Sequence, residues 1–307
     1  MNKRPRFLVL RGGAIGDFIV TLPVFAALRE RWPTAQIELI GYPHIAEIAR
    51  VAGLVDSIGS LHAAQIARFF ALNPTIPEDQ RAFIQSFDLV FNYFHDPDGT
   101  VETNLMRAGA RQVISGSPIV RETHAVDHLL KPLESLAIYA AGASPRIDLP
   151  EIERAAGRAR LGPRQPAWIL HPGSGSPSKN WPAGRFIELA RRLRETGRQP
   201  LFLVGEADAA AREGIERNAA DISLLAGLSI REVAQILSVA SGYIGNDSGI
   251  THLAAAVGAP TLALFGPTDP ALWAPRGARV RVLRAPDSRL DSISVEEVFR
   301  AAQSLGG

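Results

Sequence analysis

The feature of this sequence that most constrains its fold is an alternation, kept up almost from end to end, between short apolar runs and longer segments with apolar residues about every 3.6 positions. The short runs predict buried strands, and the longer segments predict helices. Strands that alternate with helices are joined by crossover connections and form parallel sheets. The chain is therefore predicted to be an α/β protein.

The alternation is interrupted once, between residues 142 and 166, where Pro, Gly, Arg and Ala predominate. Such a change is typical of a domain junction, and 307 residues are about twice the length of an ordinary domain. We therefore predict two Rossmann-like α/β/α domains, residues 1–150 and 151–307, which face each other across a cleft. A ligand would bind in that cleft, outside the carboxyl ends of the strands. The prediction leaves open whether the last helix packs back on the first domain.

The same patterns give the individual elements. The expected strands are 6–11, 36–41, 87–91, 112–115, 167–171, 200–204, 222–225, 242–245 and 260–265. The expected helices are 17–31, 44–52, 101–109, 126–141, 183–196, 207–219, 230–239, 249–257 and 295–305.

Composition excludes several kinds of site and partner. The chain has no cysteine, which rules out disulfides, zinc knuckles, iron–sulfur clusters and thiol nucleophiles. Its formal charge is +2, and the basic residues are spread out rather than gathered in a stripe, so we expect no nucleic-acid partner. The apolar run at 7–10 is too short for a signal peptide or a membrane span, and we expect a cytoplasmic protein.

A glycine-rich turn, Arg11-Gly12-Gly13-Ala14-Ile15-Gly16-Asp17, joins the first strand to the first helix. Glycines let the backbone approach a ligand closely, and a helix N-terminus offers free amides to an anion. The turn lacks the Gly-x-Gly-x-x-Gly spacing, and no acid ends the next strand, which argues against a nicotinamide or flavin site. Asp17 fits two interpretations, a helix cap or a base that takes a proton from an attacking hydroxyl.

Two loops in the second half of the chain also carry candidate chemistry. Residues 171–182 combine glycines, serines and Lys179, which supply amides, hydroxyls and a cation suited to a phosphate. An ordinary turn explains the serines but does not require Lys179 or Trp181. Residues 245–252 lead from a strand into a helix, where Ser248 or Asp247 fits a helix cap and His252 fits either packing or chemistry.

Four segments of the sequence occur in the order found in one family. They resemble the lipopolysaccharide heptosyltransferase family, glycosyltransferase family 9, at residues 12–17, 171–182, 246–252 and 264–268. The resemblance implies a GT-B fold, with the acceptor bound by the first domain and the nucleotide-sugar by the second. It also implies an inverting transfer, without metal or cofactor and usually from ADP-heptose, onto a glycan or lipopolysaccharide-type acceptor.

The resemblance further implies roles for single residues. Asp17 matches the general base, and Lys179 matches the lysine that faces the donor diphosphate. Glu206 matches an acid near the donor ribose, although a first-turn helix acid explains it nearly as well. The predicted donor-binding residues are Ser174, Gly175, Lys179, Trp181, Glu206, Asp247, Ser248, Gly249 and His252. The predicted acceptor-binding residues are Gly13, Ala14, Gly16, Asn92 and His95.

The identity of the acceptor stays open, because the arginines between residues 59 and 121 are scattered rather than dense. Asn92 and His95 either line the acceptor site or simply belong to a strand exit. A nucleotide-sugar epimerase, a transferase with another donor and acceptor, and a non-catalytic nucleotide-sugar-binding protein are the alternatives, and Asp17 argues against the last. Besides the nucleotide-sugar donor and a glycan or glycolipid acceptor, a transient association with the inner membrane surface is left open.

Overall fold

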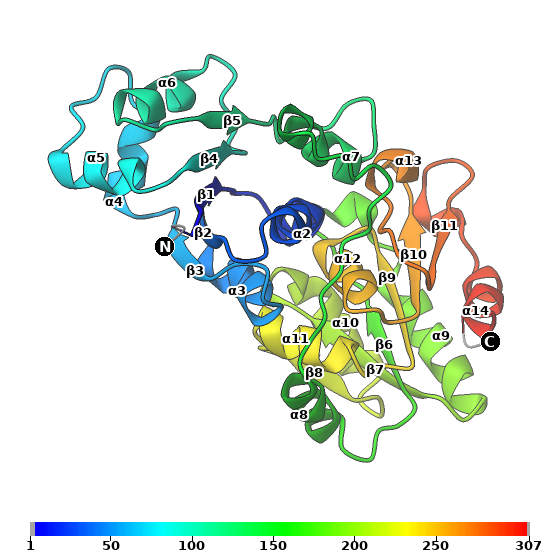
Figure 1. Cartoon of the computed structure of the whole chain (residues 1–307). Coiled ribbons are helices and arrows are strands. Elements are labelled where there is room, and N and C mark those ends of the chain that lie inside the picture. Colours follow the sequence, from blue (N-terminus) through cyan, green and yellow to red (C-terminus); the bar gives the residue numbers. More distant parts are fainter. Residues whose placement is uncertain (1–3, 306–307) are drawn as a thin grey trace. The chain divides into compact units, whose positions relative to one another are not determined.

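The structure, a computed structural model, describes residues 4–305. The chain divides into two compact units, Met1–Ala143 and Ser144–Gly307, each with its own sheet and its own buried core (Figure 1). Unit 1 and unit 2 denote these two parts.

Unit 1 is built on a five-stranded parallel sheet in the order β3-β2-β1-β4-β5. Its strands are β1 (Arg6–Leu10), β2 (Gln36–Gly41), β3 (Ser57–Ser60), β4 (Leu89–Asn92) and β5 (Val113–Ser115). The order runs outward in two directions from β1, which places the switch point between β1 and β4. The segments that carry Asp17, in α1, and His95 therefore leave the sheet at the same edge, at the carboxyl ends of β1 and β4.

Helices cover both faces of this sheet. Leu8 and Leu10 of β1 pack with buried side chains of α4, α5 and α6 on one face. On the other face Phe7 lies edge-on to Trp32 and Phe91, with ring centroids 5.0 and 6.1 Å away. The helices of unit 1 are α1 (Ile15–Ile19), α2 (Leu22–Arg31), α3 (Pro43–Val51), α4 (Ala64–Ala67), α5 (Glu78–Gln85), α6 (Thr100–Arg107) and α7 (Ala125–Leu130), with 3-10 segments η1 (Arg68–Phe70) and η2 (Lys131–Leu136).

Unit 2 has a six-stranded parallel sheet in the order β11-β10-β9-β6-β7-β8. Its strands are β6 (Ala167–His171), β7 (Gln199–Val204), β8 (Leu224–Ala226), β9 (Gly242–Asn246), β10 (Thr261–Phe265) and β11 (Val280–Arg284). Every residue of β6, β9 and β10 is buried, which is why these strands are continuous apolar runs in the sequence. The order reverses between β6 and β9, and that pair forms the switch point of unit 2.

The helices of unit 2 pack around this sheet. They are α8 (Glu151–Leu161), α9 (Ala183–Glu195), α10 (Ala209–Asn218), α11 (Ile230–Leu237), α12 (Gly249–Ala256), α13 (Pro270–Trp273) and α14 (Val295–Gln303), with 3-10 segments η3 (Pro177–Lys179), η4 (Glu206–Asp208) and η5 (Leu290–Ser292). The last helix packs against α9, and its side chains Val298 and Ala302 lie in the core of unit 2. It is therefore part of unit 2.

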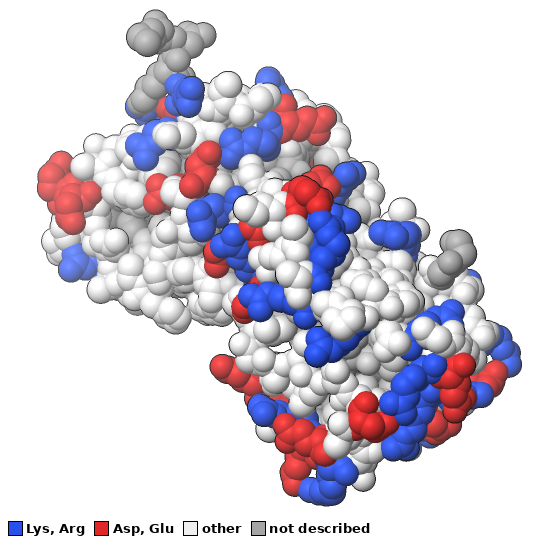
Figure 2. Space-filling view, turned by 90° about the horizontal axis from the view of Figure 1, so that it is seen from below, with Lys and Arg blue, Asp and Glu red and all other residues white. Residues whose placement is uncertain are grey.

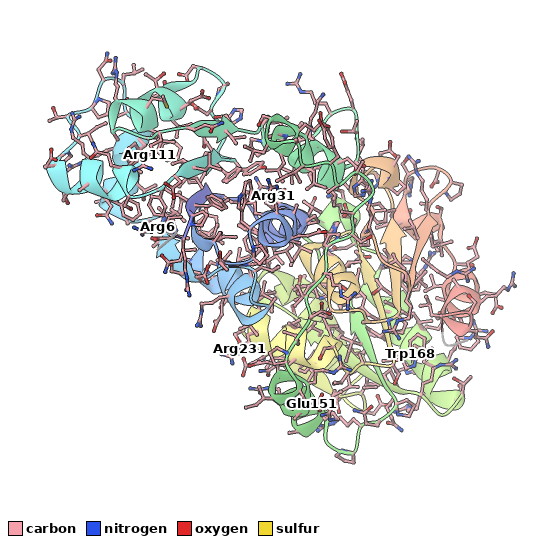
Figure 3. The ribbon with its side chains drawn as sticks, viewed as in Figure 1. Arg6, Arg31, Arg111, Glu151, Trp168 and Arg231 are labelled. Atoms are coloured by element: carbon pink, nitrogen blue, oxygen red, sulfur yellow. The ribbon has the colours of Figure 1, made fainter. Side chains whose placement is uncertain are left out.

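Helices α8 and α11 are in close contact at Gly157, where a β carbon would lie 2.1 Å from the carbonyl oxygen of Gln235. Beside this contact the buried carboxylate of Glu153 accepts hydrogen bonds from Arg231 Nε at 3.0 Å and Gln235 Nε2 at 2.6 Å. Hydrogen bonding from Arg231 lowers the pKa of Glu153 to about 2. Figure 3 labels Arg231 on α11 and Glu151 on α8. A charged pair thus fastens the two helices to each other.

The structure confirms the predicted α/β class, and two of the predicted helices differ from it. The helix expected at 17–31 is broken between α1 and α2, because Pro23 in the first turn of α2 has no N–H to continue the hydrogen-bond ladder. The helix expected at 126–141 ends at Leu130 and tightens into η2, which contains Pro132. Elements that the sequence patterns did not predict are β3, α4, α5, α8, α13 and β11.

The border between the units lies seven residues before the expected 150/151 junction. The segment that precedes α8 belongs to unit 2, because the N–H of Ile147 donates to the carbonyl of Ala256 at 2.9 Å. Helix α8 itself lies within the segment that composition marked as a junction. Its acidic first turn, basic last turn and Gly162 at φ +55° are ordinary helix start and stop signals.

Surface charge is mixed. On the face shown in Figure 2, Lys and Arg side chains stand among Asp and Glu side chains. Across residues 4–305, none of the helices has the length and apolar character needed to span a bilayer.

Candidate functional site

The switch point of unit 2 brings together two of the motifs found in the sequence. The loop 172–182 follows β6, and residues 247–248 follow β9, its neighbour in the sheet. Ligands of open α/β sheets bind outside the carboxyl ends of the strands at such a point. This edge of unit 2 is therefore the candidate ligand-binding site.

Asn246, the last residue of β9, joins the two loops. Its side chain is completely buried, and its Oδ1 accepts a hydrogen bond from the N–H of Trp181 at 3.0 Å. Its Nδ2 donates to the carbonyl of Pro172 at 2.8 Å. Both ends of the 172–182 loop are thus held to the end of β9 by one amide group. The sequence analysis included Asn246 in a motif but predicted no role for it.

Lys179 and Asp247 form an ion pair across the switch point, with Nζ 2.8 Å from Oδ2. The lysine side chain is 35% exposed, whereas the aspartate side chain is 9% exposed. An ammonium held at the edge of solvent by a nearly buried carboxylate is well placed for a second anion, such as a phosphate. The structure therefore brings these two predicted site residues into direct contact.

Ser248 caps the N-terminus of α12, because its Oγ accepts a hydrogen bond from the N–H of Thr251 at 3.3 Å. Gly249 opens the helix, so the first-turn amides follow Asp247 closely along the chain and lie at the same strand ends as the ion pair. Thr251 also contacts Tyr243, with their hydroxyl oxygens 2.9 Å apart. Burial raises the pKa of Tyr243, so its phenol stays protonated. His252 is 4% exposed on α12, as a packing residue would be.

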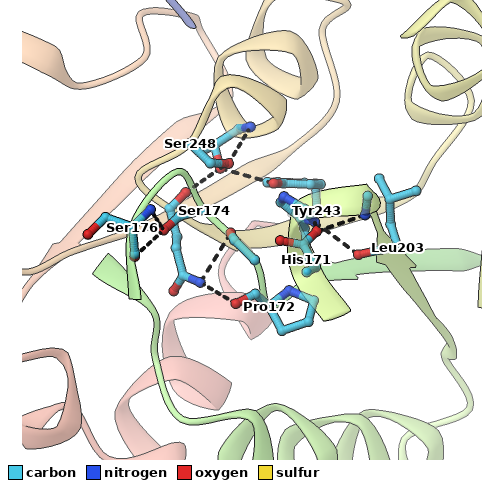
Figure 4. Close-up of polar contacts among 12 residues, drawn as sticks. His171, Pro172, Ser174, Ser176, Leu203, Tyr243 and Ser248 are labelled. Atoms are coloured by element: carbon cyan, nitrogen blue, oxygen red, sulfur yellow. Dashed lines mark hydrogen bonds and ion pairs between the residues drawn. The ribbon is translucent and has the colours of Figure 1, made fainter. Parts of the chain in front are cut away.

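A second buried cluster includes Asp208 and His171, and Figure 4 shows His171 beside Leu203. The Oδ2 atom of Asp208 accepts from the N–H of Gly205 at 2.7 Å and lies 3.9 Å from Nδ1 of His171. That Nδ1 donates to the carbonyl of Leu203 at 2.9 Å. Burial lowers the pKa of His171, so the ring is neutral and acts as a structural donor. Sequence analysis missed Asp208, although an acid three residues after Gly205 is a capping-box spacing that could have indicated it.

Three further predicted donor residues, Ser174, Gly175 and Glu206, are exposed or partly exposed. Ser174 Oγ donates to the carbonyl of Ser176 at 2.7 Å and accepts from the N–H of the same residue at 3.2 Å. These bonds fold the loop back on itself and leave Gly175 exposed. Glu206 is exposed in η4, directly after β7. All three therefore lie on loops at the carboxyl edge of the sheet.

Trp181 does not fit the predicted donor contact. Its side chain is 1% exposed, its Nε1 donates to the carbonyl of Ile293 at 2.9 Å, and its ring lies edge-on to Phe186. The indole is thus a core side chain of unit 2. The predicted contact between Trp181 and the donor is therefore corrected, because a ring enclosed on all sides offers no surface to a ligand.

In unit 1 the glycine-rich turn holds Asp17 in the capping position. Its Oδ2 accepts a hydrogen bond from the N–H of Ala14 at 3.0 Å, and Gly13 at φ +100° lies against its β carbon. Arg11 is buried beneath, and its Nη2 donates to the carbonyl of Asp17 at 2.9 Å. Burial lowers the pKa of Arg11, while Asp17 opposes that shift. The carboxylate is therefore fixed at the end of β1 and is partly exposed, as is Gly16, the residue before it.

Asn92 is not available to an acceptor. Its side chain is 1% exposed, its Oδ1 accepts from the N–H of Phe94 at 3.1 Å, and its Nδ2 donates to Asp96 Oδ2 at 3.3 Å. Asp96 in turn accepts from two first-turn amides of α6. Asn92 thus shapes the strand exit, which corrects its predicted role. His95, in the same exit, is exposed.

Metal ligands do not converge in the described part of the chain: no three His, Asp or Glu side chains within residues 4–305 are grouped as a cation would require.

Comparison with known proteins gives consistent results. Residues 106–301 match the sequence model of the family described as glycosyltransferase family 9 (heptosyltransferase). Lipopolysaccharide heptosyltransferase 1 of Escherichia coli K12 is 31% identical over 130 residues, which are 41% of this chain and 40% of that protein. The protein of the same name from Pseudomonas aeruginosa is 38% identical over 111 residues, 35% of this chain and 31% of its own length. These two matches thus span well under two thirds of either relative.

Solved structures resemble the chain over nearly its whole length. The glycosyl transferase family 9 structure from Veillonella parvula has a TM-score of 0.81 at 21% identity and covers 98% of this chain and 97% of its own. The E. coli ADP-heptose lps heptosyltransferase II structure has a TM-score of 0.80 at 19% identity and covers 98% of each chain. At such identities the likeness concerns the fold, and it confirms the predicted GT-B class with two Rossmann-like domains.

Proposed function

Because the chain belongs to glycosyltransferase family 9, we propose that it is an inverting, metal-independent glycosyltransferase that moves heptose from ADP-heptose to a glycan or lipopolysaccharide-type acceptor. The observation that carries the proposal is the pair of Lys179 and Asp247 at the switch point of unit 2. A nucleotide diphosphate is the anion that such an edge of a Rossmann-like sheet is built to hold.

The donor site in this proposal lies entirely in unit 2. The diphosphate takes the exposed side of the Lys179 ammonium, and the amides of the capping Ser248 and of Gly249 face the same charge. Asp247 holds the lysine in place before the donor arrives, because a partly buried ammonium without a partner would be costly. Glu206, exposed after β7, is proposed to accept a hydrogen bond from the ribose.

The transfer step follows from these assignments. An acceptor hydroxyl oxygen attacks the anomeric carbon from the face opposite the nucleotide, a carbon–oxygen bond forms there, and the bond to the phosphate oxygen breaks. Asp17 takes the proton of the hydroxyl, and ADP leaves with the electron pair of the broken bond. Lys179 and the α12 amides stabilise the negative charge that grows on the diphosphate, in the place where other transferases use a cation.

Asp17 is proposed as the base because the turn around it fixes a carboxylate at a strand end. The hydrogen bond from Ala14 N–H orients its Oδ2, and Arg11 fixes the backbone beneath it. The capping bond and the catalytic role are compatible, since a carboxylate oxygen has lone pairs for both a backbone N–H and a substrate proton. We also propose that the acceptor contacts Gly13, Ala14, Gly16 and His95, which lie in the same turn or at the neighbouring strand end.

The direct experiment mixes the purified protein with ADP-heptose and candidate acceptors and measures released ADP and the anomeric configuration of the product by NMR. We expect ADP release that depends on the acceptor, a product of inverted configuration and no loss of rate in EDTA. Release only from another nucleotide-sugar would favour the alternative transferase, and interconversion of sugars without an acceptor would favour an epimerase. Tight binding of the donor with no turnover of any kind would favour a non-catalytic binding protein.

The place of the reaction is part of the same proposal. We propose that the protein works in the cytoplasm and meets a glycolipid acceptor through a transient association with the inner membrane surface. Fractionation of cells that carry the tagged protein tests this, since a pellet that resists salt extraction would contradict a transient association.

A further inference from the structure

Unit 1 contains a pocket that the donor chemistry does not use. It has a volume of about 170 Å³ and lies between the edge of the sheet at β2 and β3 and the helices α4 and α5. The residues that line it are Glu38, Ile40, Gly59, Ser60, Ala63, Gln65, Ile66, Phe69, Asp79, Gln80 and Phe83.

The lining combines hydrogen-bonding groups with an apolar floor. Two carboxylates, two amides and a hydroxyl stand against Ile66, Phe69 and other apolar side chains, and none of the lining residues is Lys, Arg or His. Carboxylates and amides accept and donate hydrogen bonds to hydroxyl groups, while aromatic and aliphatic faces contact the C–H face of a sugar ring. An anionic ligand would meet the exposed Asp79 and be repelled, whereas the charge of Glu38 is opposed by that of Arg6.

Gln80 gives independent evidence that the pocket is incomplete. The residue is 7% exposed, and its Oε1 is buried with no hydrogen-bond partner among the described residues. A buried acceptor left unsatisfied costs about 1–3 kcal/mol, so a group that persists in this state points to a missing donor. Gln80 lines the pocket, and the terminal torsion of a glutamine is soft, so its amide can turn when a ligand binds.

The pocket lies beside the turn that carries Asp17. Ser60 ends β3, and the next residue, Leu61, donates its N–H to the carbonyl of Gly41 at 2.8 Å. The side chain of Leu61 reaches Gly12, where a β carbon would lie 3.3 Å from Leu61 Cδ2. One end of the pocket is thus a short step from the proposed base within the same unit.

We propose that this pocket holds one uncharged sugar ring of the acceptor, an inference that rests on the proposed function. Its volume of about 170 Å³ limits the occupant to about one ring, since an apolar cavity of about 150 Å³ holds one benzene. The ring hydroxyls bond to Gln80, Ser60 and Asp79, and the apolar face of the ring lies on Phe69 and Phe83. Acidic sugars are repelled from this position by Asp79.

The test measures binding first, without turnover. Methyl α-mannopyranoside is titrated into the ¹⁵N-labelled protein, and the side-chain NH₂ signals of Gln80 are followed, with methyl glucuronide as the acidic comparison. We expect saturable shifts with the neutral glycoside, none with the glucuronide, and at least a tenfold weaker response of the pocket backbone signals in Gln80→Leu. Leucine fills the same space without an unsatisfied oxygen, so this variant should fold at least as well as the wild type.

Kinetics then separate the subsite from the transferase proposal. Gln80→Leu should raise the KM for a neutral acceptor about tenfold and leave the KM for the donor unchanged, whereas Gln112→Leu, a change at an exposed glutamine of the same unit, should alter neither. Equal shifts with both glycosides, or an unchanged acceptor KM in Gln80→Leu while transfer proceeds, would overturn the subsite. If the protein binds the sugar saturably but transfers nothing, the pocket is a sugar-binding site and the transferase proposal is wrong.

Discussion

The carboxylate of Asp208 fills the space that a side chain at Gly173 would enter, because a β carbon on Gly173 would lie 1.8 Å from Asp208 Oδ1. The same carboxylate accepts the N–H of Gly205 at 2.7 Å. The loop after β6 and the turn after β7 are therefore fitted to each other through one acid. This contact sets where the proposed phosphate loop runs.

Gly173→Ala should consequently destabilise unit 2 by about 1–3 kcal/mol, the usual cost of overpacking a filled site. The shifted loop should also bind the donor more weakly. Denaturant unfolding and donor titration check both effects. Gly175→Ala is the matched control, since nothing lies within 4 Å of a β carbon there, and it should unfold like the wild type. Equal stability of the two variants would contradict the packing argument.

Asn246→Ala should lower the free energy of unfolding by more than an ordinary polar truncation does. It leaves the N–H of Trp181 and the carbonyl of Pro172 without their partner, at about 1–3 kcal/mol for each buried group. Asn218→Ala, at an exposed asparagine that ends α10, should change the free energy of unfolding by less than about 0.5 kcal/mol. Urea denaturation of the two variants makes the comparison, and similar losses would show that Asn246 does not fasten the loop.

The two roles of Asp17 can be separated by the choice of substitution. In Asp17→Asn the amide oxygen can still accept the N–H of Ala14, so stability should hold while turnover falls about 10²–10⁴-fold for want of a base. In Asp17→Ala the cap is lost as well, at about 0.5–2 kcal/mol. Turnover and thermal unfolding are measured on the same samples. An active Asp17→Asn variant would remove the base assignment and leave only the cap.

Much of the fold follows from the sequence because the central strands are buried on both faces. The predicted range 167–171 coincides with β6, since a continuous apolar run between polar turns marks such a strand. The predicted range 36–41 coincides with β2, where apolar residues alternate with Gln36 and Glu38. Strands at the sheet edges carry a weaker signal. In β11 the exposed Arg281 alternates with apolar neighbours, and β3 is a short polar segment that owes its conformation to pairing with β2. Tertiary pairing, which local patterns do not contain, determines these two strands.

The site was predictable where chemistry and loop position agree. Lys179 and Asp247 lie 68 residues apart and meet because their strands are neighbours, a relation that a Rossmann-like strand order supplies. Trp181 and Asn92 have the same kind of position but are buried, and burial depends on packing from distant segments such as Ile293. For Asp208 the spacing from Gly205 indicates a cap, but its contact with Gly173 arises only when the loop after β6 is folded against it.

Stability should fall in acid through Glu153. Hydrogen bonding from Arg231 lowers the pKa of this carboxyl from 4.5 to about 2. Since the pKa is depressed in the folded state, the stabilising contribution is fully present above about pH 4.5 and is lost as the pH falls toward 2. Denaturant midpoints between pH 6 and pH 3 should therefore drop less steeply in Glu153→Gln than in the wild type. Parallel pH profiles would contradict the assignment.

The most direct measurement of the central claim is calorimetric binding of ADP and AMP to the wild type and to Lys179→Ala. If Lys179 faces the diphosphate, loss of its charge-assisted contact should weaken ADP about 10- to 100-fold and bring it close to AMP. Lys131→Ala, at an exposed lysine of η2, should bind ADP like the wild type. Unchanged ADP affinity in a folded Lys179→Ala variant would contradict the proposed donor site.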